Sequence, residues 1–230
     1  NWYSYCGGNP IMFVDPSGLK DNYILYSDDS SAEDGIKPKE QAEDMKNKLE
    51  GLVDGDIIIH RVNSAEELKY YWNEVMPEDE EIGQVVIICH GVIAYNQGEN
   101  NYGIGTLKFY DESVLYAGNE FISSDSGELN KGVDVSVNDL ESKKIDFLYF
   151  SACNTANIDA KTNIVNAFRA NNPQIEVIGG WDGGVAYVPK YGYFMGIPVG
   201  GYVEKPTEYN PTVDDLAAPK KRIPLQYVEV

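Results

Sequence analysis

A cysteine and a histidine each follow an apolar segment of this sequence, and together they are residue types that perform acyl transfer. Cys153 comes after IDFLYFSA (145–152), and His90 comes after QVVIIC (84–89). An imidazolium beside a thiol favours the thiolate, which attacks a carbonyl carbon, and the imidazole then passes a proton to the leaving amine. The pair predicts a nucleophile at Cys153 and a general acid and base at His90.

Backbone amides near this pair are candidates for stabilising the charge that develops during the reaction. Gly91 directly follows His90. A residue without a side chain lets its amide approach a developing oxyanion. We therefore expect the amides of Gly91 and Cys153 to form a two-donor oxyanion hole. We also expect a helix beginning soon after Cys153 to direct amides toward the sulfur.

Alternating strand and helix patterns predict the elements that position these residues. Apolar runs predict five strands, at 22–26, 56–62, 84–91, 144–153 and 175–180, and helical spacing predicts helices at about 39–53, 64–76 and 160–170. This alternation gives a doubly wound, mostly parallel α/β sheet with the strand order 2-1-3-4-5 and helices on both faces. The third and fourth strands are then neighbours, and His90 and Cys153 lie at the same edge of the sheet.

Two segments between and after these strands have a different composition. Residues 92–141 are rich in Gly, Asn, Ser and Tyr and predict an inserted region of loops and hairpins, and 181–205 predict a further hairpin or active-site loop. In the helix at 64–76, Ser64 and Glu67 form a capping box, Pro77 ends the helix, and the buried stripe is predicted as Leu68, Tyr71, Trp72 and Val75.

Each candidate residue has a structural alternative. Cys153 is also compatible with a small buried side chain at a strand end, and His90 with a packed core histidine, but their expected place at a shared sheet edge favours catalysis. Cys89 should point to the opposite face from His90 and lie in the core, because adjacent strand residues alternate between faces. His60, the other histidine, is expected to pack or cap locally.

Three residues are candidates for substrate binding. Asp182 follows the fifth strand and is predicted either as the floor of a pocket for a basic residue or as a turn aspartate before Gly183. Trp181 is predicted as a pocket wall or as a packed side chain. Ser151, two residues before the nucleophile, is the third candidate.

Charge and composition exclude several classes of partner. The 230 residues carry a formal net charge of −19, which repels phosphate backbones and anionic lipid and favours a basic peptide or protein partner. No apolar stretch is long enough to cross a membrane, and we expect no signal peptide. The cysteines Cys6, Cys89 and Cys153 are few and far apart, which favours reduced thiols over a disulfide framework.

Other chemistries have little support in the sequence. Two histidines and scattered cysteines make no zinc cluster, and phosphate-binding loops and the Gly-x-Ser-x-Gly motif are missing. The acidic pairs Asp28-Asp29 and Asp214-Asp215 are candidates for calcium but are more typical of solvated surface. We therefore expect no cofactor.

The first nineteen residues resemble the end of the core of RHS/YD-repeat proteins. The resemblance consists of a Tyr-rich lead, Asn9-Pro10, and the motif Asp15-Pro16-Ser17-Gly18-Leu19. It implies self-cleavage between Leu19 and Lys20 by the repeat shell, and it makes 1–19 a remnant of that shell. The residues that follow would be an exported effector that acts in the cytoplasm of a target cell, with an immunity protein in the producer.

Residues 22–188 resemble the caspase-like cysteine peptidases, especially the bacterial CHAT-type and clostripain-type members. The resemblance is based on His90-Gly91 after one apolar strand, on Ser151-Ala152-Cys153-Asn154 after the next core strand, and on VIGGWDGG (177–184) after the strand that follows. It implies a peptidase domain at 20–204, followed by a tail at 205–230 that contains Lys220-Lys221-Arg222.

The sequence therefore predicts a cysteine endopeptidase effector that cleaves peptide or protein substrates through Cys153 and His90. One alternative is a catalytically silent caspase-like binding module whose acidic face docks a partner. Another is a deamidase or transglutaminase that uses the same two residues on a glutamine side chain.

Overall fold

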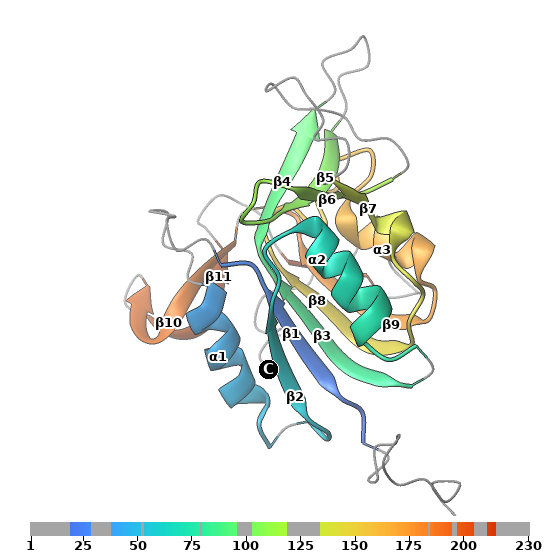
Figure 1. Ribbon diagram of the computed structural model, residues 1–230. Coiled ribbons are helices and arrows are strands. Elements are labelled where there is room, and N and C mark those ends of the chain that lie inside the picture. The colour runs from blue at the N-terminus through green and yellow to red at the C-terminus, as the bar shows by residue number, and fades with distance from the viewer. Residues whose placement is uncertain are drawn as a thin grey trace, which may run out of the picture.

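The computed structural model describes most of the chain and builds it around one central sheet (Figure 1). The described residues are 19–28, 38–51, 53–78, 80–95, 103–118, 134–183, 185–194, 197–204 and 211–214. The sheet contains β1 Asn22–Tyr26, β2 Ile57–Arg61, β3 Ile82–Ile88, β8 Ile145–Ser151, β9 Ile175–Trp181 and β12 Pro211–Asp214. Their order across the sheet is β12-β9-β8-β3-β1-β2.

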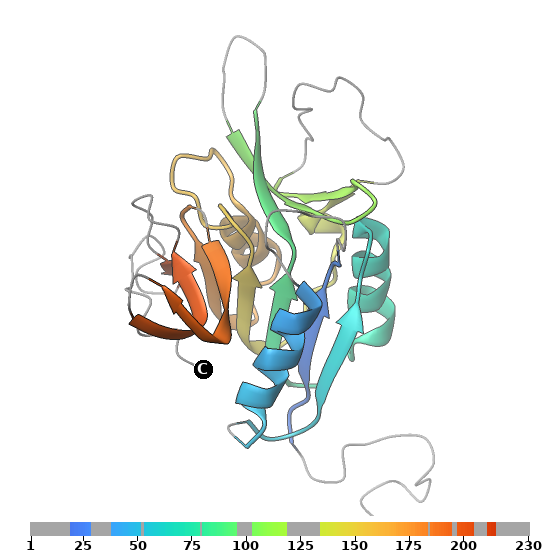
Figure 2. The same ribbon diagram turned by 90° about the vertical axis from the view of Figure 1, so that its left-hand side faces the viewer.

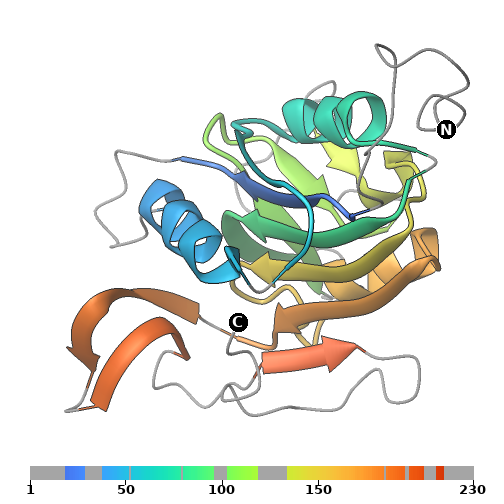
Figure 3. The same cartoon turned by 90° about the horizontal axis from the view of Figure 1, so that it is seen from below.

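The pairing confirms a mostly parallel α/β sheet with the predicted strand order. β2, β1, β3, β8 and β9 are all paired in parallel, and every residue of β1 is buried, as expected of a central strand covered on both faces. β12 adds an antiparallel strand beside β9 (Figure 3). Because β12 lies within the predicted tail at 205–230, the sheet extends further along the chain than we expected.

Helices cover both faces of this sheet. α1 (Pro38–Leu49) packs on one face through Ala42, Met45 and Leu49. α2 (Ala65–Tyr70) and α3 (Ile164–Asn171) contribute to the core on the other face. Figure 2 shows α1 in front of the sheet. α1 ends before the predicted residue 53, and Val53 instead forms an isolated bridge with Glu50.

The helix that follows β2 changes geometry half-way along. Ser64 caps α2 as predicted, since its hydroxyl accepts a hydrogen bond from the Glu67 amide at 2.9 Å. The helix then continues as the π-helical segment η2 (Tyr71–Val75), in which the Met76 amide donates to the Tyr71 carbonyl. The wider turn changes the direction of the next side chains, so Val75 is 48% exposed. Placing Val75 on the buried stripe was wrong.

The inserted region forms a second sheet, as its composition indicated. β4 His90–Tyr95, β5 Gly103–Lys108, β6 Val114–Tyr116 and β7 Val135–Ser136 lie in that order. The predicted hairpin after β9 consists of β10 Val185–Phe194 and β11 Ile197–Glu204, and it lies near α1 (Figures 2 and 3). The second sheet continues directly from β3, so its first residues belong to the edge where the candidate site lies.

Candidate functional site

The ends of β3 and β8 bring His90 and Cys153 to the same edge of the central sheet. The register pairs Ile88 of β3 with Ser151 of β8, and His90 and Cys153 each follow two residues later. Both residues are partly exposed. Because parallel strands end at the same edge, a separation of more than sixty residues in sequence becomes proximity in space.

Gly91 lies directly against the backbone of Cys153. A Cβ atom added to Gly91 would lie 1.7 Å from the Cys153 carbonyl oxygen and 2.8 Å from the Cys153 amide nitrogen. No side chain fits in this space, so a glycine is required at the start of β4, where the chain passes from the central sheet to the second sheet. The contact places two predicted oxyanion residues next to each other and fixes the position of His90 through its peptide bond to Gly91.

The two described thiols lie in different environments. Cys153 is partly exposed and packs against the core cluster on the α1 face, whereas Cys89 is only 3% exposed and belongs to the core on the opposite face. This confirms the prediction that Cys89 is a core residue. Burial, with a smaller contribution from nearby Cys153, raises the pKa of the Cys89 thiol far above its ordinary value. Cys89 is therefore an unreactive neighbour of the accessible thiol.

The turn after Cys153 is fastened to the end of β9. Asn154 has a φ of 58°, a left-handed conformation that asparagine tolerates better than most residues. Its amide donates to the Gly183 carbonyl at 2.8 Å, and the Ala156 amide donates to the Trp181 carbonyl at 2.9 Å. These two bonds hold Cys153 at a sharp, well-defined turn.

The residues after Cys153 form turns where we expected a nearby helix. α3 begins at Ile164, and Asn163 caps it by accepting a hydrogen bond from the Asn166 amide at 2.8 Å. The Val165 amide donates to the Thr155 carbonyl at 3.0 Å. Because these first-turn amides already have partners, the expectation that they point at the Cys153 sulfur was wrong, as was the helix start near 160.

The three predicted substrate-binding residues all lie in packed surroundings. Asp182 is 1% exposed, and its carboxylate accepts a hydrogen bond from the Ile158 amide at 2.9 Å. Trp181 is fully buried, and its indole donates to the Tyr149 hydroxyl at 2.8 Å. Ser151 is buried as well. For Asp182 and Trp181, these contacts favour the structural alternatives, namely a turn aspartate and a packed side chain.

Gln41 is a residue near the site that the sequence interpretation missed. It is 2% exposed on the first turn of α1, and its amide group donates to the Ser151 hydroxyl. This bond ties α1 to the strand that carries the nucleophile candidate. A signal was present in the sequence, because Gln41 lies four residues before Met45 and so falls on the buried stripe of the helix.

Other candidates lie away from this edge or outside the described residues. His60 on β2 stacks on Tyr71 with ring centroids 4.0 Å apart, which confirms its local packing. Asp15, Pro16 and Gly18 of the cleavage motif, together with Cys6, fall outside the described residues, while Leu19 is 40% exposed.

The described residues provide little support for a metal site. They contain no group of three or more His, Cys, Asp or Glu side chains arranged to hold a metal ion. The candidate calcium pairs are only partly covered, since Asp29 and Asp215 lie outside the described ranges. None of the described helices has the length and apolar character needed to cross a membrane.

Comparison of the chain with protein-family models, with curated proteins and with solved structures finds no match. The fold and the contacts at the sheet edge therefore carry the functional argument.

Proposed function

We propose that this chain is a cysteine endopeptidase of the caspase-like type, with Cys153 as nucleophile and His90 as general acid and base. The observation that carries the proposal is the contact between Gly91 and the Cys153 backbone. It supports a site in which a histidine, a thiol and an oxyanion amide come from two adjacent strand ends. The mostly parallel sheet and the hairpin after β9 are compatible with a caspase-like fold.

In the proposed reaction, His90 takes the proton of the Cys153 thiol, and the sulfur attacks the carbonyl carbon of a peptide bond and forms a tetrahedral intermediate. The amides of Gly91 and Cys153 donate to its oxyanion. When the intermediate collapses, the carbon–nitrogen bond breaks and His90 gives a proton to the leaving amine. A water molecule then gives a proton to His90 and attacks the acyl-enzyme, which releases the carboxylate product and restores the thiol.

The proposal includes no preference for a basic residue before the scissile bond. The only candidate for such a pocket was Asp182, and its buried carboxylate is bound to the Ile158 amide. Because the Asp182 carboxylate already stabilises this turn, we do not assign it to substrate binding. In this proposal, the residues around Cys153 determine the substrate preference.

The biological setting that we propose follows from the RHS-like motif at residues 15–19. The domain would be the effector at the end of an RHS-type protein, exported from a bacterium and acting in the cytoplasm of a target cell. An immunity protein in the producer would bind it. The net charge of −19 favours a basic surface on such a partner.

The test is peptide-terminus profiling of a proteome incubated with the native chain, with Cys153→Ala and with Cys89→Ser. We expect new termini with the native chain and with Cys89→Ser, and none with Cys153→Ala. One-dalton shifts or adducts at glutamine, without new termini, would favour the acyl-transfer alternative. Identical results for native chain and Cys153→Ala would refute the peptidase and favour the binding module.

A further inference from the structure

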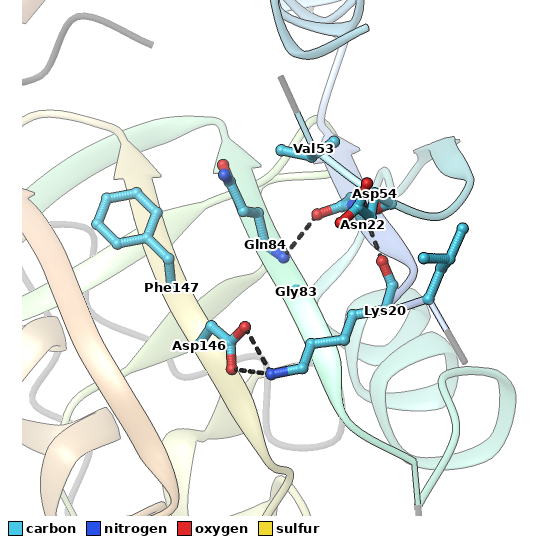
Figure 4. Close-up of a pocket in the computed structure, with 9 residues that line it drawn as sticks. Lys20, Asn22, Val53, Asp54, Gly83, Gln84, Asp146 and Phe147 are labelled. Carbon is cyan, nitrogen blue, oxygen red and sulfur yellow. Dashed lines mark hydrogen bonds and ion pairs between the residues drawn. The ribbon is translucent and has the colours of Figure 1, made fainter. Parts of the chain in front are cut away.

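A cavity of about 410 Å³ lies at the edge of the central sheet opposite to Cys153 (Figure 4). It is formed where β1, β3 and β8 begin and where α1 connects to β2. Its charged lining residues are Lys20, Asp54 and Asp146, and its apolar lining includes Val53 and Phe147. Nothing in the proposed peptidase mechanism uses this cavity.

The charges of the cavity favour a cationic occupant. The Lys20 ammonium lies 2.8 Å from the Asp146 carboxylate and 3.1 Å from Glu81, which also pairs with Lys144, so these four charges balance and Asp54 carries the excess negative charge of the cavity. Among the described residues, no cation forms an ion pair with Asp54, whose side chain is exposed at the cavity. A lysine or arginine side chain that entered here would add a pairing charge near Asp54, and its apolar stem would contact Val53 and Phe147.

The chain itself contains a segment with this chemistry. Lys220, Lys221 and Arg222 are the only three consecutive basic residues in a sequence with 18 lysines and arginines against 37 acidic residues. The apolar residues Ile223 and Leu225 follow closely. Residues 215–230 lie outside the described ranges, and they begin directly after β12.

The register of β12 brings the start of this segment close to the cavity. Asp214 pairs with Ile178 of β9, which pairs with Leu148 of β8, the neighbour of the cavity residue Phe147. With strands about 4.8 Å apart, Asp214 lies about 10 Å from β8 and about 19 Å from β1, beside which Asp54 lies. β12 is antiparallel to β9, so the chain leaves Asp214 toward the edge where the cavity lies. Fully extended, the six steps from Asp214 to Lys220 span up to about 20 Å and the eight steps to Arg222 up to about 26 Å, which is enough to reach Asp146 and Asp54.

From the cavity charges, the register and this reach, we propose that the C-terminal segment of the chain docks at this cavity. Lys220, Lys221 and Arg222 would lie beside Asp54 and Asp146, and Ile223 would cover the apolar side of the cavity. The segment would cover the edge of the sheet where the parallel strands begin, and it would leave the opposite edge, where Cys153 lies, uncovered. The docking is independent of the proposed peptidase activity.

The first test is zero-length carbodiimide crosslinking of the full chain, followed by mass spectrometry. The link between Lys20 and Asp146 is the internal reference, because these side chains are 2.8 Å apart. We expect links from Lys220 or Lys221 to Asp54 or Asp146, and loss of the Asp54 link in Asp54→Asn. Asp56→Asn, an exposed neighbour that does not line the cavity, is the matched control and should leave the links unchanged.

A mixture of unlabelled and nitrogen-15-labelled chain identifies the source of each link. Links within one chain support the proposal, whereas links between labelled and unlabelled chains would show a second copy and overturn it. The proposal would also be overturned if the reference link between Lys20 and Asp146 forms while Lys220 and Lys221 are linked only to carboxylates away from the cavity, or to none.

A second test measures protection of the basic residues from trypsin in the folded full chain. Asp54→Lys should increase cleavage after Lys220, Lys221 or Arg222 at least about fivefold, because it places a like charge at the docking site. Asp56→Lys should leave the rate unchanged. Equal cleavage rates in the native chain and in Asp54→Lys would contradict the docking.

Discussion

Replacing Gly91 with alanine tests the contact on which the candidate site depends. The added Cβ would lie 1.7 Å from the Cys153 carbonyl oxygen and 2.7 Å from its carbonyl carbon. An ordinary carbon–oxygen contact is about 3.3 Å, so the two backbones would have to separate by roughly 1.6 Å. Neither side of the contact is a flexible side chain. We therefore expect a cost at the upper end of the overpacking range, about 3 kcal/mol in the free energy of unfolding.

Urea denaturation measures this cost, and Gly179→Ala is the matched control. At Gly179 the nearest atom to an added Cβ is the Tyr149 ring carbon at 3.1 Å, so a side chain can move aside by a few tenths of an ångström. The control should cost less than about 1.5 kcal/mol. Peptide hydrolysis by Gly91→Ala, measured on folded protein, should fall about a hundredfold, because the oxyanion donor is displaced by more than 1 Å. Gly91→Ala with native stability would refute the contact.

Two further predictions concern buried polar side chains. Asp182→Ala should lower the free energy of unfolding by about 2 kcal/mol, because the Ile158 amide loses its charged, buried acceptor. It should leave unchanged the residue before the scissile bond in terminus profiling, and a changed preference would restore Asp182 as a pocket residue. Burial, with a smaller contribution from Asp21, raises the pKa of the Tyr23 hydroxyl, so above about pH 10 the unfolded chain loses this proton while the folded chain keeps it. From this group, the free energy of unfolding should then fall by up to about 1.4 kcal/mol for each unit of rising pH. In urea titrations, Tyr23→Phe should make this fall shallower, whereas Tyr110→Phe, at an exposed tyrosine, should not. Equal slopes for the native chain and both variants would contradict the assignment.

The sequence was sufficient to predict the central strands and their order. β1, β3 and β8 each contain an apolar run of four residues, which is the pattern that burial on both faces requires. β2 at the edge of the sheet has the run Ile57–Ile59, and β9 has only Val177-Ile178 between Glu176 and two glycines. The placement of His90 and Cys153 at the ends of two adjacent strands followed from that order. Gly91 was singled out for its amide, and the structure adds that its missing side chain makes room for the Cys153 backbone.

Other features depend on contacts that no local pattern reveals. The π-helical turn at Tyr71–Val75 changes the phase of a helix that continues with ordinary spacing in the sequence. β12 is four residues long and shows no alternation of apolar side chains, and its pairing depends on the free edge of β9. The region after Cys153 reads as the start of a helix, but Thr155 and Asn163 bind nearby backbone groups and hold turns there.

The sequence also could not indicate that Asp182 is buried. Its position after the fifth strand was predicted, and that position is the same for a pocket residue and for a residue that holds a turn. The distinction depends on the Ile158 amide, which lies 24 residues earlier in the chain. Only the packed structure brings these groups together.

The central claim is that His90 activates the Cys153 thiol. Its most direct test is to measure by mass spectrometry the rate at which iodoacetamide alkylates Cys153 in the folded chain at neutral pH. If His90 activates the thiol, the rate should fall at least about tenfold in His90→Ala, because the thiolate loses its partner. His60→Ala, which removes the other histidine, should leave the rate unchanged. Equal rates in the native chain and in His90→Ala would contradict the account, since Cys153 would then be an accessible thiol without a catalytic partner.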